Sequence, residues 1–331
     1  MKTKNFDPKK KVFIIAEIGN NHEGNFQIAK KLINLAAKAG VDAVKFQTFK
    51  TEEFVRVEDF KRFNQLKKFE LSYDQFEKLK NLSHKKKIKF ISTPLDIHSS
   101  IFLNKHADII KIASSDNNFF PLIDKVLKSK KPIIISTGMT NMLQVKQLLK
   151  YIEKKIGKRG CEKRVYLLHC VTSYPVENHF ANLNSIKYLI KNTKQIIGYS
   201  DHTIGNEACI AAVAMGARII EKHFTIDKNF SNFRDHALSA DYIDLKKLVL
   251  SIRKVEKQIG KFNKNIQFPE KKLIQKVRRS AYAKKNIFIS EKINSDNVIF
   301  LRPSASKSFM HIKKILGKRV NKFFLKNKVI K

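Results

Sequence analysis

Residues 12–46 read VFIIAEIGNNHEGNFQIAKKLINLAAKAGVDAVKF and carry the clearest signal for the fold class. Two short apolar runs, Val12–Glu17 and Val41–Phe46, flank Phe26–Ala39, where apolar residues recur at helical spacing before Gly40. Continuous apolar runs are typical of strands that are buried on both faces of a parallel sheet. A strand, a helix and a second strand in this order predict a parallel α/β fold.

The same unit recurs along the chain. Six further apolar runs, with segments of helical periodicity such as 141–154 and 203–216 between them, raise the number of expected strands to eight. These runs are Ile88–Ser92, Ile109–Ala113, Pro132–Ser136, Val165–His169, Ile196–Ser200 and Arg218–His223. Eight βα units within about 250 residues predict a (β/α)8 TIM barrel. The alternative is a doubly wound open sheet, but no GxGxxG phosphate loop follows the first run.

The pattern changes after Gly260. Residues 263–277 are polar and basic and include Pro269, which is typical of a linker. Residues 278–331 contain short β-like runs with little helical periodicity. We therefore expect a barrel domain over residues 10–262, a linker, and a small β-rich module over residues 278–331.

The chain is strongly basic, with 67 Lys and Arg against 29 Asp and Glu and a formal net charge of +38. Such a charge attracts polyanions, so a basic nucleic-acid-binding barrel protein is a rival hypothesis. That hypothesis predicts lysines gathered in blocks with aromatic residues between them. The lysines are instead spread along the whole chain, as a genome-wide codon bias also produces. Nucleic acid is therefore not an expected partner.

The cysteines and the apolar runs bear on the cellular compartment. Cys161, Cys170 and Cys209 lack CxxC spacing, which argues against a disulfide framework or a zinc ribbon and favours a reducing compartment. The apolar run after the basic N-terminus is too short for a signal peptide, and no run approaches the roughly 18 residues of a membrane span. We expect a cytoplasmic protein.

Two histidines follow neighbouring strands at the end where TIM barrels carry their chemistry. His202 and His223 fall at equivalent heights on the seventh and eighth strands, and parallel neighbours lie about 4.8 Å apart. Two imidazoles there can bind one divalent metal and leave coordination positions open, as a Lewis-acid site requires. The alternative is a hydrogen-bonding role for each histidine. Ligand type does not decide between Mn²⁺, Mg²⁺ and other divalent ions.

Two lysines, Lys45 and Lys111, point toward the same opening from the second and fourth strands. A lysine there forms a Schiff base with a carbonyl substrate or neutralises a phosphate or carboxylate. Two lysines together with the hydroxyls of Thr93, Ser114 and Ser200 favour an anion site, because a Schiff base needs one desolvated lysine. The pattern predicts a carbonyl substrate activated by metal beside a phosphorylated or carboxylated partner.

Short motifs occur in a fixed order along the chain. They are FIIAEIGNNHEG at 13–24, VKFQT at 44–48, STP at 92–94, KIAS at 111–114, STGM at 136–139, LHC at 168–170, GYSDHT at 198–203 and EKHFT at 221–225. Further motifs in the tail are RRS at 278–280, LRP at 301–303 and LGK at 316–318. The first set closely resembles the sialic acid synthase family, N-acetylneuraminate synthase and its nonulosonic-acid relatives. The second set is similar to the antifreeze-like (SAF) C-terminal domain of that family.

The resemblance implies a transferase reaction. Phosphoenolpyruvate condenses with the open-chain aldehyde of an N-acylated hexose such as N-acetylmannosamine, and phosphate leaves by C–O cleavage to give a nonulosonic (sialic) acid. It implies that His202 and His223 bind the divalent metal and that Glu23 lies in the active site, as a candidate for positioning or deprotonating water at C2. Positions that match phosphoenolpyruvate contacts are Lys45, Thr93, Lys111, Ser114, Thr172 and Ser200. Positions that match sugar contacts are Asp116, Tyr174, Asp235 and Arg302.

The resemblance also implies a domain-swapped homodimer, because Arg302 matches an arginine that a partner subunit's SAF domain places over the sugar. The chain departs from the family pattern at several points. Asp116 stands in a motif that usually ends in glutamate, residues 232–236 read NFRDH in place of PGPDH, and Thr172 replaces an asparagine-type donor. Most of these departures touch the sugar contacts, so the sequence leaves sialic, legionaminic and pseudaminic acid open as products. The remaining enzyme alternative is a phosphoenolpyruvate-dependent aldol synthase acting on a sugar phosphate.

Overall fold

The structure, a computed structural model, describes residues 5–306 and 308–331. Residues up to Gly260 form one compact unit, and residues from Lys261 onward form a second.

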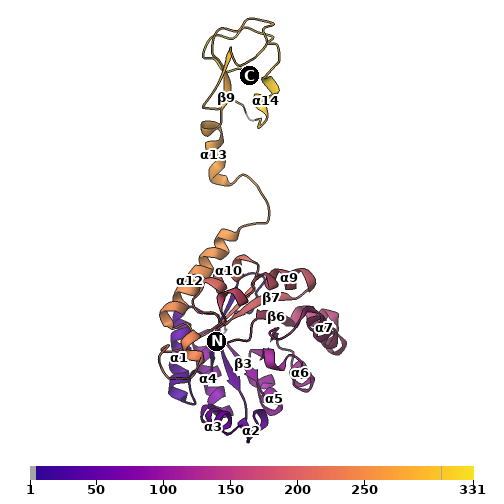
Figure 1. The fold of residues 1–331 in the computed structure, drawn as a ribbon, viewed down its shortest axis with the longest axis vertical. Coiled ribbons are helices and arrows are strands. Elements are labelled where there is room, and N and C mark those ends of the chain that lie inside the picture. The colour runs from indigo at the N-terminus through magenta and orange to yellow at the C-terminus, as the bar shows by residue number, and fades with distance from the viewer. Residues whose placement is uncertain (1–4, 307) are drawn as a thin grey trace. The chain divides into compact units, whose positions relative to one another are not determined.

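The first unit is a closed barrel of eight parallel strands that pair in sequence order, which confirms the predicted TIM barrel (Figure 1). The strands are β1 Phe13–Gly19, β2 Ala43–Thr48, β3 Lys89–Pro94, β4 Ile109–Ile112, β5 Ile133–Ser136, β6 Val165–Cys170, β7 Ile196–Asp201 and β8 Ile219–His223. Each of the eight apolar runs in the sequence contains most of one strand.

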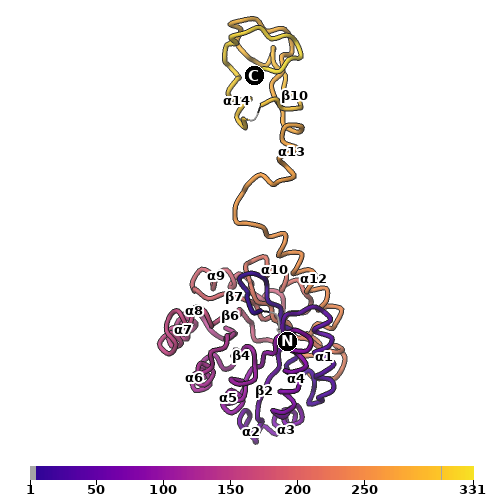
Figure 2. The backbone as a smooth tube through the Cα atoms, turned by 180° about the vertical axis from the view of Figure 1, so that it is seen from behind, coloured from indigo at the N-terminus to yellow at the C-terminus, as the bar shows by residue number. Residues whose placement is uncertain are grey.

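Helices surround the strands, as both views show (Figures 1 and 2). The main helices are α1 Phe26–Ala39, α4 Tyr73–Lys85, α5 Ile97–His106, α6 Phe120–Leu127, α7 Met142–Ile156, α9 Asn184–Asn192, α10 Glu207–Ala214 and α12 Tyr242–Ile259. Short helices lie in the connections: α2 Thr51–Phe54, α3 Phe60–Phe69, α8 Lys158–Arg164 and α11 Asp235–Leu238, with single 3₁₀ turns at Ser114–Asp116 and Asn178–Phe180. Within the described residues, every helix is too short or too polar to cross a membrane.

Local sequence fixes where these helices begin and end. The side chain of Asn25 accepts hydrogen bonds from the backbone N–H groups of Gln27 and Ile28, which caps the start of α1. The helix ends at Gly40, whose φ of 96° is favourable for glycine. Asn141 and Gln144 form a capping box at the start of α7. Strands β1 and β5 therefore lead into α1 and α7 over short connections that end in a capped helix start.

Alternate residues of each strand face opposite sides of the barrel wall. On β1, Ile14, Ala16 and Ile18 face outward and pack with the helices in the main apolar core. Inward residues form a separate apolar layer inside the barrel. Its members are Phe13, Ile15, Ala43, Ile91, Ile109, Ile134, Leu168 and Ile219. This layer forms the floor beneath the polar residues that follow on the same strands.

Gly198 occupies the inward position of β7 next to this layer. A Cβ atom there would lie 2.5 Å from the carbonyl oxygen of Ile219 and 2.5 Å from Cδ2 of Leu168. Because real Cβ atoms do not approach that closely, only glycine allows β7 and β8 to pack at this point. Ser200 is the next inward position of β7, and His202 follows directly after the end of this strand.

A buried ion pair fixes the outer face of β7 and β8. Asp201 Oδ2 lies 2.8 Å from Lys222 Nζ, and both side chains are almost fully buried. Asp201 Oδ1 accepts hydrogen bonds from the hydroxyl groups of Tyr199 and Thr203 and from the Thr203 backbone N–H. Breaking such a pair by removing one partner costs about 3–5 kcal/mol. The pair therefore holds the chain firmly on both sides of His202.

The second unit contains two antiparallel strands, β9 Ser280–Ala283 and β10 Val298–Leu301, and the helices α13 Phe268–Val277 and α14 His311–Ile315. Its small apolar core is formed by Ala281, Ala283, Ile287, Ile293, Val298, Val320, Phe324 and Ile330. Helix α13 lies in the segment for which the sequence indicates a linker. Pro269 stands in its first turn, where the missing N–H leaves no intrahelical bond unmade.

Candidate active site

A cavity of about 320 Å³ opens where the barrel strands end. On four strands, a polar residue of this lining lies two positions after an inward residue of the apolar layer, and so faces the barrel interior as well. Ile15 is followed by Glu17, Ala43 by Lys45, Ile109 by Lys111 and Ile219 by Glu221. The full lining is Glu17, Lys45, Gln47, Phe54, Arg62, Thr93, Leu95, Lys111, Ala113, Ser114, Ser115, Ser136, Cys170, Thr172, Tyr174, Ser200, His202, Glu221, His223 and Arg234. The alternation of the strands thus concentrates charged and polar groups at one end of the barrel.

Glu221 stands at the centre of the charged groups in the cavity. Its Oε1 lies 3.0 Å from Nζ of Lys45 and 3.2 Å from Nζ of Lys111. The same oxygen accepts a hydrogen bond from Ser200 Oγ at 2.8 Å. Lys45 Nζ also lies 3.4 Å from Oε1 of Glu17. All four charged side chains are buried, so two ammonium groups and two carboxylates share one water-poor space.

Burial and neighbouring charges set the protonation of this cluster. Burial alone would raise the pKa of Glu221, but Lys111 and Lys45 hold it below its usual range, so Glu221 stays ionised. Burial raises the pKa of Glu17 to about 7, although Lys45 opposes this rise. Burial lowers the pKa of Lys111, whereas Glu17 and Glu221 hold the pKa of Lys45 above its usual range against the effect of burial. When Glu17 is protonated, two lysines face a single carboxylate, and the cavity can accept an anion.

The two histidines predicted as metal ligands lie close together in this cavity. Their ring centroids are 5.3 Å apart, and the ring of Tyr174 packs 4.2 Å from that of His202. His202 Nδ1 lies 2.7 Å from the carbonyl oxygen of Val171, which leaves Nε2 for another partner. Within the described residues, His223 Nδ1 is buried without a hydrogen-bond partner, and Asp235 Oδ2 lies 3.9 Å from it. Two imidazoles beside a buried carboxylate are a donor set that fits a divalent cation.

Comparisons with known proteins identify the family of this chain. The model of the NeuB family matches residues 32–264. The chain belongs to the NeuB family. It is 38% identical over 336 residues to the N,N'-diacetyllegionaminic acid synthase of Campylobacter jejuni, covering 97% of this chain and 99% of that protein. It is 33% identical over 289 residues to the N-acetylneuraminate-9-phosphate synthase of Mus musculus, covering 83% of this chain and 79% of that protein.

A solved structure of a sialic acid synthetase also resembles this NeuB chain. The N-acetylneuraminic acid synthetase of Leptospira borgpetersenii serovar Hardjo-bovis, solved in complex with citrate, is 36% identical with a TM-score of 0.74. The match covers 80% of this chain and 90% of that one. The predicted resemblance to the sialic and nonulosonic acid synthases is therefore confirmed, and the family is one of enzymes.

The NeuB cavity contains most of the residues predicted for it. Those present in the lining are Lys45, Thr93, Lys111, Ser114, Thr172, Tyr174, Ser200, His202 and His223. Among the described residues, Glu23, Asp116 and Asp235 are not part of that lining. Glu23 Oε1 accepts a hydrogen bond from Ser231 Oγ and lies 3.1 Å from His236 Nε2, whereas Asp116 accepts one from Ser115 Oγ. Arg302 belongs to the second unit.

The cavity also contains charged groups that were not predicted as site residues. Glu17 and Glu221 could have been found, because each lies two residues beyond an inward apolar residue of its strand. Arg62 comes from α3, and Arg234 comes from the loop between β8 and α11. Both segments lie in long connections between strands, so the sequence pattern of the strands does not place their side chains at the cavity.

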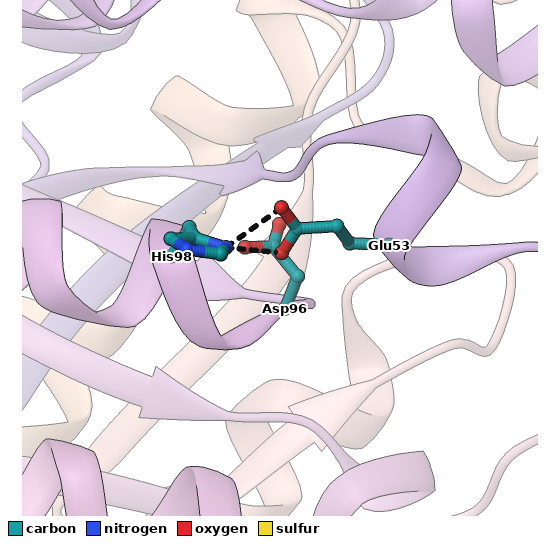
Figure 3. A group of neighbouring side chains, drawn as sticks. All are labelled: Glu53, Asp96 and His98. Atoms are coloured by element: carbon teal, nitrogen blue, oxygen red, sulfur yellow. Dashed lines mark hydrogen bonds and ion pairs between the residues drawn. The ribbon is translucent and has the colours of Figure 1, made fainter.

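A second group of possible metal ligands, formed by Glu53, Asp96 and His98, lies outside the cavity lining (Figure 3). His98 Nδ1 lies 2.7 Å from the Glu53 carboxylate. Asp96 caps α5, accepting hydrogen bonds from the Ser99 N–H and hydroxyl and from the Lys50 N–H. Because both Asp96 oxygens already accept hydrogen bonds, the capping role accounts for this group without a metal.

Proposed function

We propose that this protein condenses phosphoenolpyruvate with the open-chain aldehyde of an N-acylhexosamine to form a nonulosonic acid. The single observation that carries the proposal is the pair of buried lysines around Glu221 in the same cavity as the histidine pair. Relatives named as synthases of diacetyllegionaminic acid and of N-acetylneuraminate 9-phosphate support this class of product.

Phosphoenolpyruvate carries a phosphate and a carboxylate, and both need counter-charges in a buried site. We assign them to Lys45 and Lys111, with the neutral donors Thr93, Ser114, Thr172 and Ser200 around them. Glu221 contacts both Nζ atoms, at 3.0 and 3.2 Å, and so keeps the two cations close together before the substrate arrives. Holding two reactants in one orientation can lower a barrier by about 7–11 kcal/mol.

We assign the binding of a divalent cation, Mn²⁺ or Mg²⁺, to His202 and His223. When bound, such a cation would supply Lewis acidity at the aldehyde oxygen, which makes the carbonyl carbon more open to attack by C3 of phosphoenolpyruvate. The hydrogen bond from His202 Nδ1 to the Val171 carbonyl fixes the tautomer of that ring. We propose that the carboxylate of Asp235, whose Oδ2 lies 3.9 Å from His223 Nδ1, orients the ring of His223.

The loss of phosphate is assigned to cleavage of the C2–O bond, which requires water to add at C2. We propose that Glu23 orients or deprotonates that water. The Glu23 carboxylate contacts Ser231 and His236, which both follow β8 in the chain. For this role the Glu23 side chain has to turn away from these two residues and toward the cavity.

The second unit is proposed to act as a SAF domain over residues 278–331, joined to the barrel domain of residues 10–262 by residues 263–277. In a homodimer it would supply Arg302 to the partner's site. A cytoplasmic location is supported by Cys161, Cys170 and Cys209, which are all buried and unpaired.

Phosphate release from phosphoenolpyruvate tests the proposed function. We expect release with an N-acylhexosamine in the presence of Mn²⁺ or Mg²⁺, and none after chelation of the metal. The matched control is the corresponding reduced alditol, which lacks the aldehyde and should give no release. A sugar phosphate without an acylamino group belongs in the same panel. If only that compound supports turnover, the aldol synthase alternative holds and the proposed function is wrong.

A further inference from the structure

A buried ion pair lies directly before the two histidines, on the outer face of the barrel wall. Asp201 on β7 is the register partner of Lys222 on β8, and each residue immediately precedes one of the histidines. Asp201 Oδ2 lies 2.8 Å from Lys222 Nζ, and the two side chains are only 0% and 1% exposed. Because side chains alternate between the two faces of a strand, both point away from the cavity, and neither belongs to the described residues that line it. The pair therefore does not touch a substrate in the cavity.

Hydrogen bonds connect this pair to the backbone beside His202. Asp201 Oδ1 accepts hydrogen bonds from the backbone N–H of Thr203 at 2.9 Å and from its hydroxyl group at 2.8 Å. Lys222 Nζ donates to the carbonyl oxygen of Thr203. Cys209 Sγ, on α10, donates to Asp201 Oδ2 at 3.3 Å. One network thus links β7, β8 and α10, and it holds both the residue before His202 and the residue after it.

The inner face of the same two strands carries a matching contact. Ser200 and Glu221 are register partners one residue earlier and line the cavity. Ser200 Oγ donates to Glu221 Oε1 at 2.8 Å. Side chains therefore join β7 to β8 on both faces of the wall, just before His202 and His223. The ring centroids of these histidines lie 5.3 Å apart, and this separation depends on how the two strands are held together here.

Stability alone does not account for an ion pair buried at this position. Taking two charges out of water costs so much free energy that hydrophobic residues of similar volume often stabilise a fold equally well or better. An ion pair differs from such residues in direction, because charged groups hold their partners at a short distance and in one orientation. The partners here are backbone groups next to a candidate metal ligand. Groups behind metal ligands change metal affinity by about 10- to 100-fold when they are replaced.

We propose that Asp201 and Lys222 are positioning residues of the metal site. Their ion pair sets the spacing of His202 and His223, and so the affinity of the site for a divalent cation. Both side chains lie on the opposite face of the barrel wall from the cavity, so they act through the backbone and not as ligands. This inference rests on the assignment of the histidine pair as the metal site in the proposed function.

The test measures the affinity of the full-length protein for Mn²⁺ without substrates, from the electron paramagnetic resonance signal of free Mn²⁺. The double variant Asp201→Asn/Lys222→Met removes both charges together, so no buried charge is left unpaired. We expect it to bind Mn²⁺ about 10- to 100-fold more weakly than the wild type does. Its affinity for phosphoenolpyruvate in the absence of metal should change little, because Lys45 and Lys111 lie on β2 and β4.

Asp42→Asn/Arg253→Met is the matched control, because it removes another ion pair of the barrel. Arg253 Nη2 lies 2.5 Å from Asp42 Oδ2, and Asp42 directly precedes β2, at the opposite end of the strands from the cavity. This variant should leave the affinity for Mn²⁺ unchanged. If it weakens Mn²⁺ binding as much as the first double variant does, a general loss of stability explains both results and the inference is wrong.

Circular dichroism shows whether each variant is folded. A folded Asp201→Asn/Lys222→Met variant that binds Mn²⁺ as tightly as the wild type overturns the inference, even though the proposed function stands. If that variant does not fold, Thr203→Val replaces it, since valine keeps the shape of the side chain and removes one hydrogen bond to Asp201. Unchanged Mn²⁺ affinity in Thr203→Val also overturns the inference. A wild type that binds neither Mn²⁺ nor Mg²⁺ contradicts the metal assignment of the proposed function itself, and the inference is then wrong as well.

Discussion

His223→Ala is expected to lower kcat/KM by roughly 10³-fold or more, because a Lewis acid at the aldehyde supplies several kcal/mol of charge stabilisation. His223 is buried, its Nδ1 has no hydrogen-bond partner among the described residues, and its ring lies 5.3 Å from that of His202. Alanine removes one of the two imidazoles that the described residues contribute to the cavity lining. The measurement is steady-state turnover together with metal content after dialysis against Mn²⁺.

The control for this prediction is His98→Ala, which disrupts the other group of possible metal ligands, Glu53, Asp96 and His98. Because Asp96 caps a helix and His98 is largely exposed, this variant should keep both bound metal and turnover. If His98→Ala loses the metal while His223→Ala retains it, the assignment of the histidine pair as the metal site is wrong.

Lys111→Met is expected to weaken the use of phosphoenolpyruvate by about 10²–10³-fold in kcat/KM, since truncating one partner of a buried charge pair costs about 2–5 kcal/mol. Lys111 lies 3.2 Å from Glu221 and is almost fully buried. Methionine keeps the length of the side chain but removes the charge. Most of the loss should appear as weaker binding of phosphoenolpyruvate, which calorimetry measures directly.

Lys89→Met is the matched control for the loss of one lysine from a barrel strand. Lys89 begins β3, at the opposite end of the strand from the cavity, and its Nζ lies 3.7 Å from Asp108. Its replacement should leave the affinity for phosphoenolpyruvate unchanged. Normal affinity in a folded Lys111→Met variant would show that the buried lysines do not bind the donor.

The barrel and the centre of its cavity could be predicted from the sequence, because both depend on patterns that repeat over a few residues. Eight apolar runs mark the strands, and the residues that end them enter the interior at every second position. Lys45, Lys111, His202 and His223 were found in this way. Glu221 follows the same rule, and the structure shows that it joins both lysines.

The loops could not be predicted in the same way. Arg62 and Arg234 reach the cavity because Phe69 packs on Phe233, a contact between segments that lie far apart in the chain. No local pattern encodes such a contact. Glu23 illustrates the same limit, since its carboxylate contacts Ser231 and His236 from a distant loop. The sequence therefore predicts the residues on the barrel strands, to which phosphoenolpyruvate binding is assigned, better than the residues that the connecting segments bring to the cavity.

The most direct test of the central claim follows the fate of C3 of phosphoenolpyruvate. The enzyme is incubated with phosphoenolpyruvate labelled with ¹³C at C3, an N-acylhexosamine acceptor and Mn²⁺, and the carbon is followed by NMR. The account predicts that the vinyl methylene signal is replaced by that of a saturated methylene bonded to the former aldehyde carbon of the sugar. Recovery of the label as the methyl group of pyruvate, or unchanged phosphoenolpyruvate with every acceptor of the panel, would contradict it.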